Sequence, residues 1–75
     1  MKCDHKLNCK GLSCPLPILK LSKAMKGVKV GETLELISTD PGSVDDVPKW
    51  CKKSDNELLS IYEVDGIYHF VIEKK

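Results

Sequence analysis

Hydrophobic and polar residues alternate at the start of the chain. From Cys3 to Cys9 every second residue falls on one, mostly apolar side, and the residues between them are charged or polar. A period of two is typical of a strand with one buried face. Residues 32–38 repeat the pattern, with Leu34 and Leu36 on either side of Glu35. The sequence therefore predicts strands over residues 3–10 and 32–38.

The segment between these two strands has apolar residues at helical spacing. The predicted helix opens at Cys14-Pro15, with proline in the first turn, where a missing N–H costs least. Gly27 is expected to end it, and lysines occupy its outward positions. Its apolar stripe consists of Ile18, Leu21, Met25 and Val28.

A second, shorter helix is predicted over residues 43–53. The segment from Ser43 to Asp46 resembles a capping box with aspartate in place of glutamate. Pro48 lies inside the helix, so we expect a kink or a loose first turn. The expected apolar stripe consists of Val44, Val47 and Cys51.

The remainder of the chain predicts a β-hairpin. Residues 58–64 and 67–74 are rich in β-forming side chains, and Asp65-Gly66 between them is a strong hairpin signal. The order is therefore strand, helix, strand, helix, strand, strand. Right-handed crossovers place both helices on one face of a four-stranded mixed sheet. We predict an α/β (α+β) two-layer sandwich that forms a single domain over residues 1–75.

Size and charge narrow the possible functions. A chain of 75 residues has no room for a deep enclosed pocket, so any chemistry should lie on the surface and be completed by a partner. Twelve lysines balance eleven acidic residues, and there is no arginine, which argues against nucleic-acid binding. No apolar run is long enough to span a membrane, and the first residues lack the apolar core of a signal peptide. We expect a cytoplasmic protein whose cysteines are thiols, metal ligands or redox groups.

Cys14 differs in position from the other three cysteines. Cys9 and Cys51 occupy apolar positions of a strand and a helix, where free cysteine packs as a small hydrophobe, and Cys3 lies near the terminus. Cys14 follows a glycine-containing turn and precedes a helix, a place where the helix dipole favours a thiolate. We identify Cys14 as the candidate nucleophile.

The prolines around Cys14 affect its expected pKa. Pro15 and Pro17 remove two N–H donors from the first helical turn, so those of Leu16 and Ile18 remain near the sulfur. We therefore expect the dipole to lower the thiol pKa modestly, by about one unit. A strongly lowered pKa would make the thiolate a weak nucleophile, because thiolate nucleophilicity falls as the pKa falls. A modestly lowered pKa therefore suits a sulfur that must both accept and release a group.

Other cysteine chemistries fit less well. A thioredoxin-like pair would need cysteine at the position of Pro17, and a hydrolase would need a base, for which only His5 and His69 are available on predicted strands. A zinc site of Cys3, His5, Cys9 and Cys14 would lack the usual C-x2-C spacing, so we expect neither a metal nor another cofactor. A lone polarised thiol favours a carrier whose cargo is the sulfur itself.

The chain resembles the TusA/SirA-type family of small sulfur-carrier proteins from about Leu7 to Lys74. The most specific match is Gly11-Leu12-x-Cys14-Pro15-x-Pro17 after the first strand. The other matching segments are Gly31-Glu32-Thr33-Leu34, Asp40-Pro41, Asp46-Val47-Pro48, Cys51, Glu57-Leu58 and Asp65-Gly66.

The resemblance implies the same fold and a sulfurtransferase-type activity. Cys14 would carry sulfane sulfur as a persulfide, with Gly11, Pro15 and Pro17 supporting the motif. A cysteine desulfurase or rhodanese-type protein would be the donor and another protein the acceptor. Contact with a membrane permease is conceivable for such a carrier, although the chain is not membrane-embedded, and we expect a monomer.

The chain departs from the family at a few positions. Asn8 stands where relatives often have aspartate, Cys9 replaces a small apolar residue, and lysines replace the arginines common around the second helix. The missing charge at Asn8 affects partner choice more than sulfur transfer. Lys49, Lys52 and Lys53 are interpreted as a solvated face rather than as a docking surface. Two alternatives stay open: a non-catalytic regulatory or interaction module, and direct handling of thiosulfate or selenium at the same thiol.

Overall fold

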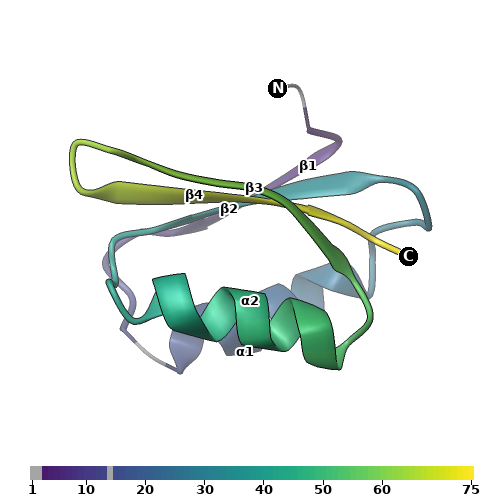
Figure 1. Cartoon of the computed structure of the whole chain (residues 1–75), viewed down its shortest axis with the longest axis horizontal. Helices are drawn as coiled ribbons and strands as arrows, with labels where there is room; N and C mark the ends of the chain where they lie inside the picture. The colour runs from purple at the N-terminus through teal and green to yellow at the C-terminus, as the bar shows by residue number, and fades with distance from the viewer. Residues whose placement is uncertain (1–2, 14) are drawn as a thin grey trace.

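The computed structural model describes residues 3–13 and 15–75, and Figure 1 shows two layers. Both helices lie on one face of a sheet with strand order β1-β2-β4-β3, in which β1 and β2 are parallel and β4 is antiparallel to both of its neighbours. This confirms the predicted fold class. Neither helix is long and apolar enough to cross a membrane within the described residues. The elements are β1 (His5–Cys9), α1 (Leu16–Met25), β2 (Thr33–Ser38), α2 (Ser43–Lys53), β3 (Glu57–Val64) and β4 (Ile67–Glu73).

The core lies between the helices and the inner face of the sheet. Leu36 of β2 pairs with Leu7 of β1 on one side and with Phe70 of β4 on the other. Leu36 and Phe70 are fully buried, whereas Glu35, one position away, faces the opposite side of the sheet. Leu21 and Met25 of α1 close the core from the helix layer, as their spacing predicts.

Helix α2 buries two of its three predicted stripe residues, and Ser43 takes the place of Val44. Val44 is 38% exposed, whereas Ser43 is only 2% exposed and lies on the buried side with Val47 and Cys51. The Ser43 hydroxyl shares a hydrogen bond of 2.9 Å with the hydroxyl of Ser38 at the end of β2. The predicted stripe is therefore wrong at Val44, because the hydrogen bond between the two hydroxyls allows the polar Ser43 to be buried in its place.

The capping-box prediction is also wrong. Gly42 is the N-cap of α2 and no side chain caps the helix, since Ser43 already lies inside it. Asp40 orders the entry instead, because its Oδ1 accepts the Gly42 N–H at 3.1 Å and its carbonyl accepts the Ser43 N–H at 3.0 Å. The first turn follows the three-residue bonding of a 3₁₀ helix, and α2 then continues through Pro48 to Lys53.

The hairpin between β3 and β4 forms as predicted. Asp65 and Gly66 both have positive φ, 50° and 80°, the combination required by a two-residue type I′ turn. Val64 pairs with Ile67 directly across this turn. Strand β3 begins at Glu57 and follows the outer edge of the sheet, so the hairpin provides half of the sheet against which α2 packs (Figure 1).

Candidate functional site

The loop between β1 and α1 is tied to the neighbouring strand. The Gly11 N–H donates to Oγ1 of Thr39, which directly follows β2, at 2.9 Å, and the Leu12 N–H donates to the Cys9 carbonyl at 3.2 Å. Gly11 has φ of 81°, a conformation that other residues adopt only with strain. These contacts fix the loop just before Cys14, which itself lies outside the described residues.

The two motif prolines have different environments. Pro17, in the first turn of α1, is fully buried, whereas Pro15 is the exposed N-cap residue and offers no side-chain cap. The Leu16 N–H donates to the Ser13 carbonyl at 2.9 Å. The expectation that this N–H is available to the neighbouring sulfur is therefore wrong, because the loop folds back and uses it.

Two of the other cysteines are buried, as predicted. Cys9 at the end of β1 is 0% exposed and Cys51 in α2 is 2% exposed. Burial raises the pKa of Cys9, although nearby Lys20 acts in the opposite direction, and burial raises the pKa of Cys51 to about 11. A buried thiol that stays protonated is a poor nucleophile. Cys3, before β1, is partly exposed.

Both histidines are engaged with carboxylates of the sheet layer. His5 Nε2 lies 2.9 Å from Glu32 Oε1, at the end of β1 away from the loop that leads to Cys14. His69 Nδ1 lies 3.1 Å from Glu35 Oε2, on the face of the sheet away from the helices. Each histidine therefore has a carboxylate partner within hydrogen-bonding distance.

The residues of the proposed zinc alternative are spread along β1 and beyond it. Cys9 faces the helix layer, and His5 at the other end of the strand bonds to Glu32. Across residues 3–13 and 15–75, no three side chains of His, Cys, Asp or Glu come together in a group that could hold a metal ion. The fourth residue of that alternative, Cys14, lies outside the described residues.

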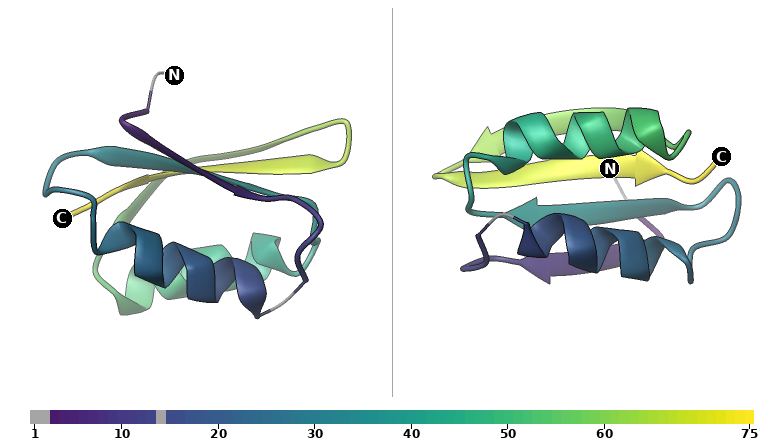
Figure 2. Two further views of the ribbon diagram at one scale, coloured as in Figure 1. Left: turned by 180° about the vertical axis from the view of Figure 1, so that it is seen from behind. Right: turned by 90° about the horizontal axis from the view of Figure 1, so that it is seen from below.

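A shallow groove of about 340 Å³ lies between the two helices. The right-hand view of Figure 2, from below, shows α1 and α2 side by side beneath the sheet. Because β1 and β2 are parallel, both helices start at the same end of the molecule. The groove therefore begins beside the loop that carries the cysteine motif. It is lined by Pro15, Ile18, Asp46, Lys49, Trp50 and Lys53.

Exposed apolar side chains extend this surface along the start of α1. Leu16 is 45% exposed and Leu19 is 59% exposed, directly after the cysteine motif. Neither leucine, nor Trp50, was predicted from the sequence as part of the site. A signal was available, because Leu19 is an apolar residue next to the outward-facing Lys20 and Trp50 is the only tryptophan in the chain.

The fold defines a class of small two-layer proteins. The SirA-like protein of Desulfitobacterium hafniense superposes with a TM-score of 0.82 over 92% of this chain and 95% of that one, at 18% identity.

Sequence comparison identifies the family within this class. Residues 5–74 match the family of sulfurtransferase TusA, so the chain belongs to the TusA family. The sulfur carrier protein TusA of Allochromatium vinosum is 44% identical over 71 residues, covering 95% of this chain and 93% of that protein. The sulfur carrier protein TusA of Buchnera aphidicola is 40% identical over 95% of this chain and 90% of its own length. Longer relatives also exist: this chain spans 34% of one from Aquifex aeolicus and 39% of one from Bacillus subtilis.

Proposed function

We propose that the protein relays sulfane sulfur between two partner proteins as a persulfide on Cys14. In the loading step the Cys14 thiolate attacks the outer sulfur of a donor persulfide. A sulfur–sulfur bond forms at Cys14, the donor's own sulfur–sulfur bond breaks, and the donor cysteine leaves as a thiolate with the electron pair. An acceptor thiolate then attacks the outer sulfur on Cys14, and Cys14 leaves as the thiolate. Neither step requires an external oxidant, reductant or cofactor.

The burial of the two competing thiols is the observation that carries this proposal. A TusA-family chain needs a cysteine that two partners can reach, and Cys9 and Cys51 are at most 2% exposed with raised pKa values. Cys14 is the cysteine of the family motif, and its neighbours Ser13 and Pro15 are exposed. The anchored loop and the buried Pro17 support a fixed position for this motif.

Several further expectations belong to the same proposal. The activity is a sulfurtransferase reaction in which Cys14 is regenerated as a thiolate in each cycle. The donor is a cysteine desulfurase or a rhodanese-type protein, the acceptor is a second protein, and a membrane permease is a further partner to test. We place the protein in the cytoplasm, as a monomer acting as one sulfur-carrier domain over residues 1–75.

Mass spectrometry tests the proposal directly. The reduced protein is incubated with a cysteine desulfurase and cysteine, then alkylated, digested and mapped. We expect a gain of about 32 Da, one sulfur atom, on Cys14 and no gain on that peptide in Cys14→Ser. Cys51→Ala is the matched control and should load normally. Sulfur mainly on Cys9 or Cys51 would overturn the proposal, as would loading that persists in Cys14→Ser. A wild-type protein that takes no sulfur from any donor would favour an interaction module instead.

A further inference from the structure

Positive charge is concentrated on the helix layer. Helix α1 has no acidic residue, and α2 has only Asp45 and Asp46, both in its first turn. The sheet layer and the segments next to it contain acidic residues that pair with a histidine or a lysine: His5–Glu32, His69–Glu35, Lys75–Glu57 and Lys75–Glu73. The exposed lysines of the helices, none of which takes part in these pairs, are Lys20, Lys23, Lys49, Lys52 and Lys53.

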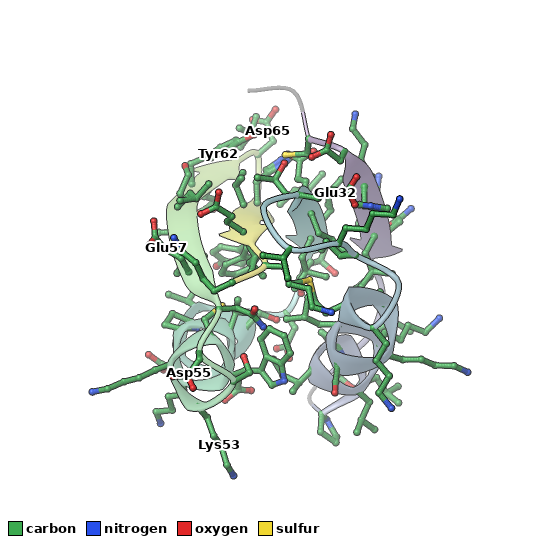
Figure 3. The ribbon with its side chains drawn as sticks, turned by 90° about the vertical axis from the view of Figure 1, so that its right-hand side faces the viewer. Glu32, Lys53, Asp55, Glu57, Tyr62 and Asp65 are labelled. Atoms are coloured by element: carbon green, nitrogen blue, oxygen red, sulfur yellow. The ribbon has the colours of Figure 1, made fainter. Side chains whose placement is uncertain are left out.

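The groove combines an apolar floor with two of these lysines. Ile18 and the ring of Trp50 lie between the helices and pack against the core, while Lys49 and Lys53 lie on the α2 side of the groove. Figure 3 shows Lys53 projecting away from the sheet, on the opposite side of the molecule from Tyr62. At about 340 Å³ the groove is at the lower end of the range for ligand sites, and it is open to solvent. It has room for a side chain or two of a protein segment.

We propose that this groove is the docking site for an acidic segment of a partner protein, with one apolar side chain seated on Trp50 and carboxylates beside Lys49 and Lys53. The inference rests on the proposed function, because sulfur transfer between two proteins requires that each docks beside the cysteine motif. Charge complementarity decides the chemistry of the occupant. The exposed lysines of the helix layer outnumber its two acidic residues, Asp45 and Asp46, so a segment rich in carboxylates complements the excess positive charge and is attracted from a distance.

An acidic protein segment fits these side chains better than a nucleic acid does. The chain has no arginine for bidentate phosphate binding, and its net charge is only +1. The apolar floor has no counterpart in a phosphate backbone, whereas an apolar residue flanked by glutamates matches both parts of the groove.

An NMR titration with two synthetic peptides tests the docking site. The probe is an acetylated and amidated peptide in which leucines alternate with pairs of glutamates, and its counterpart has lysines in place of the glutamates. We expect the acidic peptide to shift the Trp50 indole resonance and the amides of residues 46–53, and the basic peptide to leave them unchanged. Raising the salt to roughly 0.5 M should weaken the binding by about tenfold, because the Debye length then falls to a few ångströms. Shifts absent from the groove, or equal for the two peptides, would overturn the proposal.

Matched variants separate the groove from the rest of the helix layer. Lys49→Gln combined with Lys53→Gln should weaken the acidic peptide by at least about fivefold. Lys23→Gln combined with Lys52→Gln removes the same two charges from the helix layer outside the groove and should stay within about twofold. Equal losses in the two variants would show that net charge alone governs binding and would overturn the proposal.

The failure of this inference can be distinguished from the failure of the proposed function. Loading of Cys14 from inorganic polysulfide needs no docked protein, so the lysine variants should load as the wild type does. Peptide binding by Cys14→Ser should equal that of the wild type, because the side chains proposed to contact the peptide are those of Lys49, Trp50 and Lys53. If polysulfide loads Cys14 and the acidic peptide does not bind the groove, the docking proposal fails and the carrier function stands.

Discussion

The buried thiols make a quantitative prediction about cysteine reactivity. Burial raises the pKa of Cys51 from an ordinary value of 9.0 to about 11. At pH 7.5 roughly 0.03% of such a thiol is ionised, about a hundredfold less than for an unperturbed cysteine. Only 2% of the residue is exposed, so a reagent reaches the sulfur rarely even when it is ionised. Together these effects should slow native alkylation of Cys51 by about three orders of magnitude relative to an exposed thiol.

Timed alkylation measures this difference for each cysteine. The reduced protein is treated with iodoacetamide at pH 7.5, quenched with acid at intervals, digested and quantified by mass spectrometry. Cys9, which is also fully buried, should follow Cys51, and Cys3→Ser should leave Cys14 as the only rapidly labelled thiol. Guanidinium chloride provides the control, since unfolding should bring all thiols to similar rates. Native labelling of Cys51 within about tenfold of the exposed thiol would refute the inference that burial silences it.

Three further predictions concern the framework of the site. Ser43→Ala removes the 2.9 Å partner of the buried Ser38 hydroxyl, whose oxygen still accepts the Asp40 N–H at 3.1 Å. The loss of this one hydrogen bond should cost about 0.5–1.5 kcal/mol and lower the melting temperature by several degrees in a thermal scan; an unchanged temperature would contradict the pairing. Glu35 is partly desolvated, which acts to raise its pKa, but hydrogen bonds from a histidine and a tyrosine hold the pKa below its ordinary value of 4.5. The ionised Glu35 therefore contributes its full stabilisation above pH 4.5, and this stabilisation is lost as the pH falls through the lowered pKa. Glu35→Gln should thus be destabilising in urea unfolding at pH 7, and the difference from the wild type should shrink below about pH 4. A difference that does not change with pH would contradict this prediction. Gly11→Ala should lower the free energy of unfolding by about 1–2 kcal/mol through the positive φ alone, because a Cβ at this position meets no atom within 4 Å. Gly11→Asn should lower it less in the same assay, and equal losses would argue against backbone strain.

Local patterns were sufficient to predict most of the fold. Three elements depend only on residues close together in the sequence, and all three are present in the structure. They are the strand around Leu34 and Leu36, the helix that includes Leu21 and Met25, and the Asp65-Gly66 turn. The order of these elements, together with the handedness of crossovers, then defined a two-layer sandwich.

The burial of Ser43 in place of Val44 and the use of the Leu16 N–H depend on three-dimensional contacts that the sequence pattern does not contain. Ser43 and Val44 could exchange roles, and only the hydroxyl of Ser38 on a neighbouring strand decides between them. Leu16 loses its free N–H because the loop folds back to Ser13, a turn that propensities alone did not predict.

Part of the candidate site could be predicted from the sequence, and part could not. Burial of Cys9 and Cys51 could be predicted, because each lies on a periodic apolar face. The groove could not, because Ile18 and Trp50 come from two helices whose relative placement depends on the whole sheet. Ile18 was assigned to the core by its spacing, whereas it lies at the border of the core and lines the groove.

The central claim is that one thiol of the four carries transferable sulfur, and cyanolysis tests it most directly. The protein is loaded with sulfane sulfur, desalted and treated with cyanide, which releases that sulfur as thiocyanate. We predict about one equivalent from the wild type, the same from a variant in which Cys3, Cys9 and Cys51 are all alanine, and none from Cys14→Ser. Thiocyanate from Cys14→Ser at the wild-type level would contradict the account, because the sulfur would then be carried elsewhere.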